Sequence, residues 1–366
     1  SIRKITAPFI ILSGLLAFPS LASELPTGAS VVSGSASISS DGSAMTVNQS
    51  SNALITNWQS FSIRADNSVT FNQPTSTSVA LNRVVGQDTS QIFGNLNANG
   101  QVFLLNPNGI IIGTSGRVQT GAFIASTLDI SNEDFLAGNY NFTGSEGSIV
   151  NNGSITGAVV ALIAPSVTNG ETGSIEGDSA LSAGTDVLLD FDGDGLISIE
   201  VQASTVATLV DNQGMIQADG GLVILSAQGA SDALKGVVNN TDTIQANTIG
   251  SENGRIYLLA DMANGEINAT GTLEANFIET SAATLNIDAN LNVNTSGGEW
   301  LIDPVNITIG DSKATAIETA LASGNVTVST EDGATWASET NGTGSDEGNI
   351  IVDASIDFYF AGIANE

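Results

Sequence analysis

The 366-residue chain contains neither cysteine nor histidine. Without cysteine it can form no disulfide, and it offers no thiolate as a nucleophile or metal ligand. Without histidine it lacks the commonest general base and the commonest transition-metal ligand. A serine–histidine–aspartate triad and the usual zinc sites are therefore excluded.

Positive charge is the second shortage. Eight Lys and Arg residues stand against 38 Asp and Glu, which gives a formal net charge of −30. A chain of this charge repels nucleic acid and anionic membrane surfaces, so neither is an expected partner. No segment after the N-terminal apolar run is long enough to cross a bilayer, and we expect a protein that does not span a membrane.

The residues that are abundant favour strands and turns. Only 13% of the chain is charged, and it contains 40 glycines alongside many Val, Ile, Thr, Asn and Ser residues. β-Branched residues suit a pleated sheet, whereas Asn, Ser and Gly suit turns. The composition therefore predicts an all-β protein, with enough residues for one large core or two domains.

The first 22 residues have the pattern of a secretory signal peptide. Arg3 and Lys4 form a short basic start, residues 7–18 form an apolar run, and residues 20–22 (SLA) are small or apolar. A signal peptidase reads small residues at such positions, so we predict cleavage after Ala22. The mature protein would then be exported through the periplasm.

A repeat in the middle of the chain indicates a solenoid. Residues 210–218 (VDNQGMIQA) resemble residues 238–246 (VNNTDTIQA), and residues 150–157 (VNNGSITG) form a looser third copy. A second strand type follows at 157–164, 221–227 and 254–260. Equivalent apolar residues that recur in this way should stack on successive coils.

Recurrent asparagines should occupy the corners of these coils, where stacked amides can satisfy turn groups. An isolated Asn-Gly pair would indicate an antiparallel hairpin, and an ordinary β-sandwich is the alternative. A sandwich gives no reason for the repeat. We therefore predict a right-handed, single-stranded parallel β-helix (solenoid) with an N-terminal cap and small extra-helical elements.

One helix is predicted near the C-terminus, where Ser312 can cap it and Gly324 can end it. We interpret this helix as a flap over the side of the solenoid. Residues 331–348 read as an acidic, glycine-rich loop, and a further strand begins at Ile350. A solenoid that stops without a polar cap is unusual, so we expect the chain to be part of a longer protein.

An ordered series of short motifs identifies a family. The motifs are 57–61 (NWQSF), 71–74 (FNQP), 79–84 (VALNRV), 100–110 (GQVFLLNPNGI), 121–130 (GAFIASTLDI) and 300–304 (WLIDP). Together they resemble the haemagglutination-activity, or TPS, domain of filamentous-haemagglutinin-like exoproteins of Gram-negative bacteria. The Asn-Pro-Asn-Leu string that the filamentous haemagglutinin carries before its Ala-Leu-Asn-Arg region is absent from this chain.

The resemblance implies two-partner secretion. An outer-membrane β-barrel transporter would recognise the domain through periplasmic modules and export it, and the β-helix would then form outside the cell, from the N-terminus onward. The resemblance divides the chain into a signal peptide (1–22), a TPS secretion domain (23–260) and a continuing β-helix or repeat region (261–366). It implies a secreted or cell-surface, adhesin-type exoprotein whose receptor, on a host cell, a carbohydrate or another bacterium, would bind the downstream region.

The segment Asn106, Pro107, Asn108, Gly109 and Ile110 is the candidate recognition site. Pro fixes φ, and Asn and Gly permit a left-handed step, so the segment reads as a turn. Its residues could therefore contact the transporter directly or only stabilise the turn. The sequence leaves both roles open.

One segment has the opening of a calcium-binding loop. Asp190, Asp192 and Asp194 follow the pattern Asp-x-Asp-x-Asp-Gly, but Val201 stands where the closing Glu of an EF-hand belongs. A weak calcium site in a β-turn is one interpretation, and an exposed acidic turn is the other. No other cofactor is expected.

A polysaccharide lyase or glycosidase is the alternative function, because β-helices host such enzymes. These enzymes need clustered carboxylates, and lyases often need an Arg or Lys base. After the signal peptide only six basic residues remain, and they are scattered along the chain. We therefore predict that the protein is not an enzyme.

Overall fold

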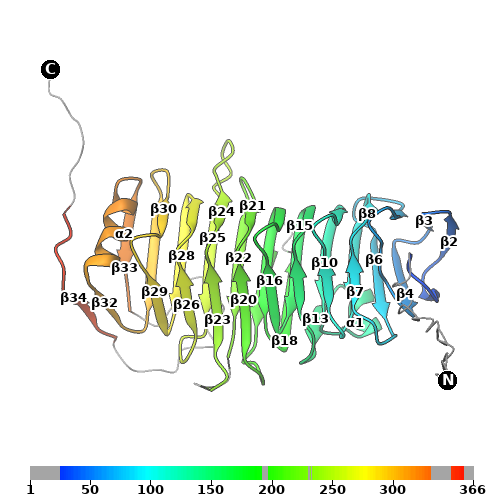
Figure 1. The fold of residues 1–366 in the computed structure, drawn as a ribbon, viewed down its shortest axis with the longest axis horizontal. Helices are drawn as coiled ribbons and strands as arrows, with labels where there is room; N and C mark the ends of the chain where they lie inside the picture. The colour runs from blue at the N-terminus through cyan, green and yellow to red at the C-terminus, as the bar shows by residue number, and fades with distance from the viewer. Residues whose placement is uncertain (1–24, 192–196, 230, 232, 331–347, 358–366) are drawn as a thin grey trace, which may run out of the picture.

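The computed structural model describes residues 25–191, 197–229, 231, 233–330 and 348–357. Over these residues the strands stack as successive coils of an elongated parallel β-helix, with β1–β4 at one end and β33 at the other (Figure 1). The predicted fold class is confirmed. The predicted signal peptide lies outside the described residues.

Between the two ends of the rod, the coils contribute strands to three faces. The long-strand face has the strands β4 (Ala53–Trp58), β6 (Val79–Val84), β9 (Gln101–Leu105), β12 (Ala122–Ser126), β22 (Leu222–Ala227), β25 (Arg255–Ala260), β28 (Phe277–Ala282), β31 (Glu299–Pro304) and β33 (Asn325–Val328). The short-strand face has the strands β3 (Ala44–Gln49), β5 (Ser68–Asn72), β8 (Asn95–Ala98), β11 (Arg117–Gln119), β21 (Met215–Gln217), β24 (Thr243–Ala246), β27 (Thr272–Ala275) and β30 (Asn292–Asn294). Strands β15 (Ser154–Ala164) and β17 (Ser174–Ala183) run through the corner between these faces, which joins them into one 21-stranded sheet.

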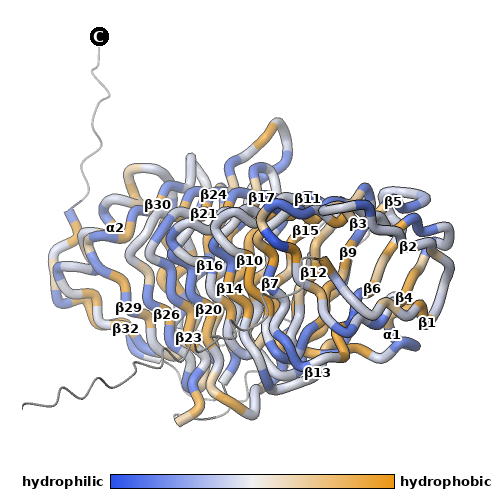
Figure 2. Tube along the Cα trace, turned by 45° about the vertical axis from the view of Figure 1, so that its right-hand side comes forward, coloured by the Kyte–Doolittle hydropathy of each residue, from blue (hydrophilic) through white to orange (hydrophobic). Residues whose placement is uncertain are grey.

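The third face is a separate eight-stranded parallel sheet. Its strands are β7 (Ser90–Ile92), β10 (Ile110–Ile112), β14 (Ile149–Asn151), β16 (Ser166–Asn169), β20 (Thr208–Asn212), β23 (Gly236–Asn240), β26 (Glu266–Ala269) and β29 (Thr284–Ile287). Figure 2 shows apolar stretches recurring from coil to coil along the rod, with hydrophilic stretches between them.

The N-terminal end has the predicted cap. Strand β1 (Ser30–Ser33) pairs antiparallel with β4, and β2 (Ala36–Asp41) forms an antiparallel hairpin with β3. Strand β3 then pairs in parallel with β5, which begins the solenoid. The cap therefore converts the edge of the first coil into antiparallel pairs, and this protects the edge from unwanted pairing.

Two insertions cover the outside of the long-strand face. Helix α1 (Asn132–Ala137) and β13 (Tyr140–Thr143) follow β12, and the hairpin of β18 (Asp186–Phe191) and β19 (Ile197–Val201) follows β17. Strands β13, β18 and β19 form a three-stranded antiparallel sheet. Apolar side chains on this sheet and on α1 pack against outward-facing residues of the long strands, including Phe103 and Ile163, and form a second core outside the solenoid.

Inside the solenoid, inward-facing side chains at equivalent positions of successive coils stack in rows. One row on the short-strand face joins, in register, Val69, Leu96, Val118, Ile155, Ile175, Ile216, Ile244, Leu273 and Val293. Every one of these side chains is buried. Truncating one of these Leu or Ile side chains to Ala would leave a cavity between two coils and lower the free energy of unfolding by about 2–5 kcal/mol.

A ladder of buried asparagines runs along the eight-stranded sheet. The side-chain amide of Asn151 donates to Asn169 (2.9 Å), that of Asn169 donates to Asn212 (2.8 Å), and that of Asn212 donates to Asn240 (2.7 Å). Each of the four side chains is 0% exposed. In the two inner rungs each amide oxygen therefore accepts from one neighbour and each amide nitrogen donates to the next, and Asn169 also donates to the Met215 carbonyl (3.4 Å), so each of these nitrogens and oxygens has a partner within the protein.

The repeat is confirmed for two copies and shifted in the third. Strand β20 pairs with β23 so that Val210 faces Val238 and Asn212 faces Asn240, as the repeat predicts. In the looser copy Ile149 rather than Val150 holds the position of Val210, so this copy begins one residue earlier than predicted. Asn151 then lies at the position of Asn212.

A glycine in the repeat marks a close approach between coils. A β-carbon at Gly214 would collide with the carbonyl oxygens of Gly170 and Gly173 on the preceding coil. Gly153 stands in the same relation to Gly113 and Gly116. Gly153 and Gly214, each two residues after a ladder asparagine, are therefore required by space, whereas Asp242 holds the equivalent position after Asn240.

The C-terminal helix exists, but its cap and its place differ from the prediction. Helix α2 spans Asp311–Leu321, and its N-cap is Gly310, with no side-chain capping bond, so Ser312 lies inside the helix. Strand β32 (Ile307–Ile309) precedes it, and β33 follows. The helix therefore takes the place of a short strand in the last coil instead of forming a flap on the side, and its buried Ala and Ile side chains join the inner core.

The predicted strand at Ile350 is present as β34 (Ile350–Val352), which pairs in parallel with β32. Among the described residues, no helix has the length and apolar character that crossing a membrane would require.

Candidate functional site

The predicted recognition turn forms the corner between β9 and β10. The backbone N–H of Gly109 donates to the carbonyl of Asn106 (3.1 Å), which closes the turn. Gly109 has a φ of 108°, in the left-handed region that favours glycine. Ile110 then starts β10 and is fully buried between Ser90 and Ile149 of the neighbouring coils.

Asn106 is an internal strut of this corner. Its side chain is 0% exposed, and its amide nitrogen donates to the Asp88 carbonyl (2.9 Å) and to the Ser90 hydroxyl (3.0 Å). Its amide oxygen accepts from the backbone N–H (3.0 Å) and the side chain (3.1 Å) of Asn108. All of its polar positions are used inside the protein.

Pro107 and Asn108 form the outer surface of the same turn. Both are exposed, whereas Asn106, Gly109 and Ile110 are buried. The side chain of Asn108 also donates to the Gly86 carbonyl of the preceding corner (3.0 Å). Of the five predicted residues, these two are therefore the ones that the folded protein leaves exposed.

The other family motifs build the core of the first coils. The indole N–H of Trp58 donates to the side-chain oxygen of Asn82 (3.0 Å), and both residues are 0% exposed. Trp58 also packs edge-to-face on Phe61, with ring centroids 5.4 Å apart. The buried amide of Gln73 donates to the side chain of Gln49 on the neighbouring coil (3.2 Å). These motif residues are thus structural rather than surface groups.

Arg83 forms a set of contacts, here called the clamp, that no sequence pattern predicts. Its guanidinium donates to Asp129 (2.8 Å), to the side chain of Asn132 (2.8 Å) and to the carbonyl of Ile130. Its partners lie 46 or more residues away, so no local pattern reveals them. The one available signal is a lone arginine in an otherwise uncharged strand, 79–84 (VALNRV).

A hollow of about 290 Å³ lies beside the recognition turn and the clamp. Arg83 and Asp129 border it, and its other lining residues include Val84, Val85, Leu105, Leu128, Pro107 and Asn108. Leu105 and Leu128 are 1% exposed, whereas Val85 is 56% exposed. The hollow thus has a buried apolar floor, an exposed apolar rim and one wall made by the turn.

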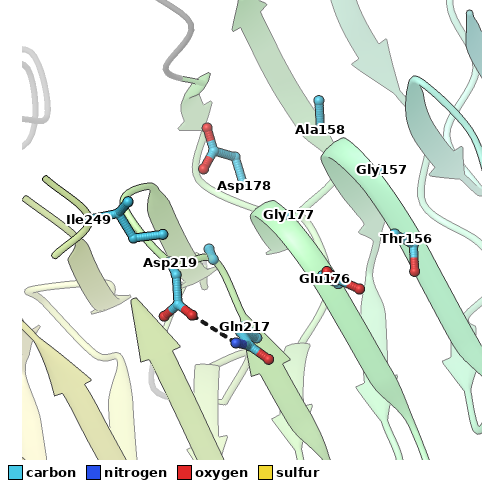
Figure 3. Close-up of a pocket in the computed structure, with 10 residues that line it drawn as sticks. Thr156, Gly157, Ala158, Glu176, Gly177, Asp178, Gln217, Asp219 and Ile249 are labelled. Atoms are coloured by element: carbon cyan, nitrogen blue, oxygen red, sulfur yellow. Dashed lines mark hydrogen bonds between the residues drawn. The ribbon is translucent and has the colours of Figure 1, made fainter. Parts of the chain in front are cut away.

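A second, more polar hollow of about 440 Å³ lies farther along the rod (Figure 3). Its lining includes Thr156, Glu176, Asp178, Gln217, Asp219 and Ile249. Figure 3 shows Gln217 bonded to Asp219, while Glu176 and Asp178 extend from the neighbouring stretch of chain.

The carboxylates of this second hollow are tied to the backbone. Asp178 accepts from the N–H of Leu222 (3.0 Å), and Asp219 accepts from the N–H of Asn247 (3.0 Å). Burial raises the pKa of Asp178, and the bond from Leu222 opposes that shift. The two aspartates therefore anchor turns, and no basic residue lines the hollow to serve as the base of a lyase.

The predicted calcium loop cannot be placed as a whole. Asp190 is the penultimate residue of β18, opposite Ser198 of β19, while Asp192 and Asp194 lie outside the described residues. Within the part of the chain that the structure describes, no group of three Asp or Glu side chains could hold a metal ion. The calcium site stays a prediction.

Known proteins resemble this chain in both sequence and fold. The family model described as the TPS secretion domain matches residues 22–275. A heme/hemopexin-binding protein of Haemophilus influenzae is 34% identical over 253 residues, which cover 66% of this chain and 28% of that protein. A second Haemophilus influenzae protein of the same name is 29% identical over 290 residues, 71% of this chain and 31% of its own length.

Among solved structures, the HMW1 secretion domain from Haemophilus influenzae superposes with a TM-score of 0.64 at 25% identity. The match covers 90% of this chain and 100% of that domain. The chain spans about three-tenths of the length of the curated relatives it matches. The predicted boundary at residue 260 stays a prediction, since β25 and β28 pair across it without a break.

Proposed function

The chain belongs to the TPS secretion domain family, and from that premise we propose that an outer-membrane β-barrel partner with periplasmic modules recognises and exports it. The match of the family model over residues 22–275 carries this proposal. The protein would then be secreted or displayed at the cell surface. The β-helix would form outside the cell, because a packed three-faced coil is far wider than an extended chain in a barrel pore.

The recognition turn would have two roles that different residues perform. Asn106 holds the corner together from inside, so its loss should destabilise the fold. Pro107 and Asn108 are exposed and are available to a partner. Under this proposal the two functions that the sequence left open would fall on neighbouring residues.

Export with a co-expressed partner tests this division. Asn106→Ala should lower stability by about 1–3 kcal/mol for each buried group that it leaves without a partner. Asn108→Ala should change melting little and yet reduce the extracellular yield. Gly109→Ala is the control, because it strains a residue with φ 108° and removes no polar group.

Three outcomes are informative. An export defect of Asn108→Ala that exceeds that of Gly109→Ala at equal melting temperature supports direct recognition. If export falls only as stability falls, the turn is structural. Wild-type export of both Asn variants would show that the turn has no part in secretion.

The effector function would lie largely outside this chain. The curated relatives are heme/hemopexin-binding proteins, and the aligned part is less than a third of each. Heme iron is usually held by His, Cys, Met or Tyr, and none of these lines either hollow described above. We therefore assign no heme role to this region, and the proposed adhesin-type activity would belong to downstream sequence.

The family is one of secretion domains of exoproteins and is not an enzyme family. The six basic residues after the signal peptide are scattered, and the carboxylates of the polar hollow are bound by backbone amides. We accordingly propose a non-catalytic role. Turnover of a polysaccharide by the purified chain, lost on Asp178→Asn, would contradict it.

A further inference from the structure

The hollow beside the recognition turn exists only when three coils are stacked. Its walls are the corners that follow β6, β9 and β12, at residues 83–86, 105–108 and 128–129. Arg83 faces Leu105 across β6 and β9, and Leu105 faces Ser126 across β9 and β12. An unfolded chain would therefore carry the motif but not the hollow.

The clamp makes this hollow rigid. Arg83 binds the corner at Asp129 and Ile130, and Asn108 binds Gly86, so each corner is fixed to its neighbour. Leu105 and Leu128 form a floor that is already packed against the outer core. A rigid apolar hollow can accept one side chain from a partner with little ordering cost.

Charge around the hollow selects a basic partner. The guanidinium of Arg83 is engaged by three acceptors inside the protein. The carboxylate side chain of Asp129 is 64% exposed, and Asp88 and Glu133 are also exposed. A partner that presents an apolar side chain beside Lys or Arg would complement this surface.

We propose that the hollow docks a surface-exposed loop of the outer-membrane partner, which inserts an apolar side chain flanked by a basic residue. This inference rests on the proposed function. The hollow forms only after three coils have left the pore, so the part of the transporter that it can meet is the outer face, where barrels carry their longer loops. Docking there would hold the first folded coils at the pore mouth while later coils follow.

The experiment measures binding of the folded full chain, with the signal peptide removed, to its partner in nanodiscs. Val85→Lys places a positive charge on the exposed rim, where it repels the basic residue of the partner, and should weaken binding at least tenfold at unchanged melting temperature. Val352→Lys is the matched control, because Val352 is also 56% exposed but lies on β34 near the other end of the rod. Wild-type binding should also weaken as salt is raised from 50 to about 300 mM.

Other results overturn the proposal. The first is that the rim variant binds the partner as tightly as the control variant does, and the second is that the chain binds empty nanodiscs as tightly as nanodiscs that contain the partner. The third is that the chain self-associates at the same concentration. The fourth is that the urea-unfolded chain binds the partner whereas the folded chain does not. Export of the wild type with the co-expressed partner is measured in parallel. Partner-dependent export together with any of these results rejects the docking hollow and leaves the proposed function standing, whereas export without the partner rejects the proposed function itself.

Discussion

Replacing one rung of the buried asparagine ladder should destabilise the protein severely. In Asn212→Ala, the amide of Asn169 loses its acceptor at 2.8 Å and the oxygen of Asn240 loses its donor at 2.7 Å. All three side chains are 0% exposed, so water cannot replace the missing partner without opening the coil. A buried group left unsatisfied costs about 1–3 kcal/mol, so two such groups should lower the free energy of unfolding by about 2–6 kcal/mol.

An exposed ladder supplies the control for that variant. Asn286 is part of β29 in the same sheet, its side chain is exposed, and it donates to Asn268 (2.8 Å) and to Glu266 (3.0 Å). Because Asn286 is exposed, water can replace both bonds, and Asn286→Ala should change stability by no more than about 0.5 kcal/mol.

Urea titrations followed by circular dichroism compare the two variants. Coils of a solenoid can unfold in stages, so hydrogen exchange of the eight-stranded sheet should accompany the titration. The reasoning would be refuted if Asn212→Ala lowered the free energy of unfolding by less than about 1 kcal/mol, or by no more than Asn286→Ala does. The ladder would then not be a stabilising network.

Two further predictions concern carboxylates. Burial, and to a smaller extent the Asp303 carboxylate, raise the pKa of Glu279 above its ordinary value of 4.5, while the Ser281 hydroxyl opposes this. The folded state therefore holds this proton more tightly than the unfolded state, and stability should fall as pH rises above about 4.5 and through the raised pKa. Glu279→Gln should flatten that decline in urea titrations from pH 4 to 8, and an unchanged slope would contradict it. If Asp190, Asp192 and Asp194 bind calcium, millimolar calcium should raise the melting temperature and the triple Asn variant should abolish the rise; a parent protein indifferent to calcium would reject the site.

The stacking of coils could be predicted because the sequence repeats it. Each coil buries the same positions, so Val210 and Val238 occupy equivalent environments and select similar residues. The same logic predicted asparagines that stack on asparagines. Repetition along the chain is therefore a direct record of contact between neighbouring coils.

The register of the third copy could not be predicted from apolar residues alone. Residues 149 and 150 are both β-branched and apolar, so either can fill the inward position of Val210. The steric requirement at the glycine distinguishes the two alignments, because the glycine must lie where carbonyl oxygens of the preceding coil approach most closely. Gly153 and Gly214 both meet that requirement when Ile149 takes the inward position.

The candidate site was only half predictable. The turn at 106–110 is local, and its residue types reveal it. The hollow needs the side chain of Arg83 to meet Asp129 and Asn132 across two coils and an insertion. Those insertions interrupt the repeat, so no periodic signal places them.

Buried amides also explain how parallel strands with similar apolar patterns keep one alignment. A slip of two residues would preserve the inward and outward alternation of β20 against β23, so apolar packing alone discriminates weakly against it. The same slip would move the amide of Asn212 two positions away from Asn240 and leave polar groups of both buried and unpaired. The amides are neutral, so burying them costs far less than burying charge. The asparagine ladder therefore penalises the misaligned coil much more than it strengthens the aligned one, and this is the property that the proposed folding from the N-terminus onward, one coil at a time, would require.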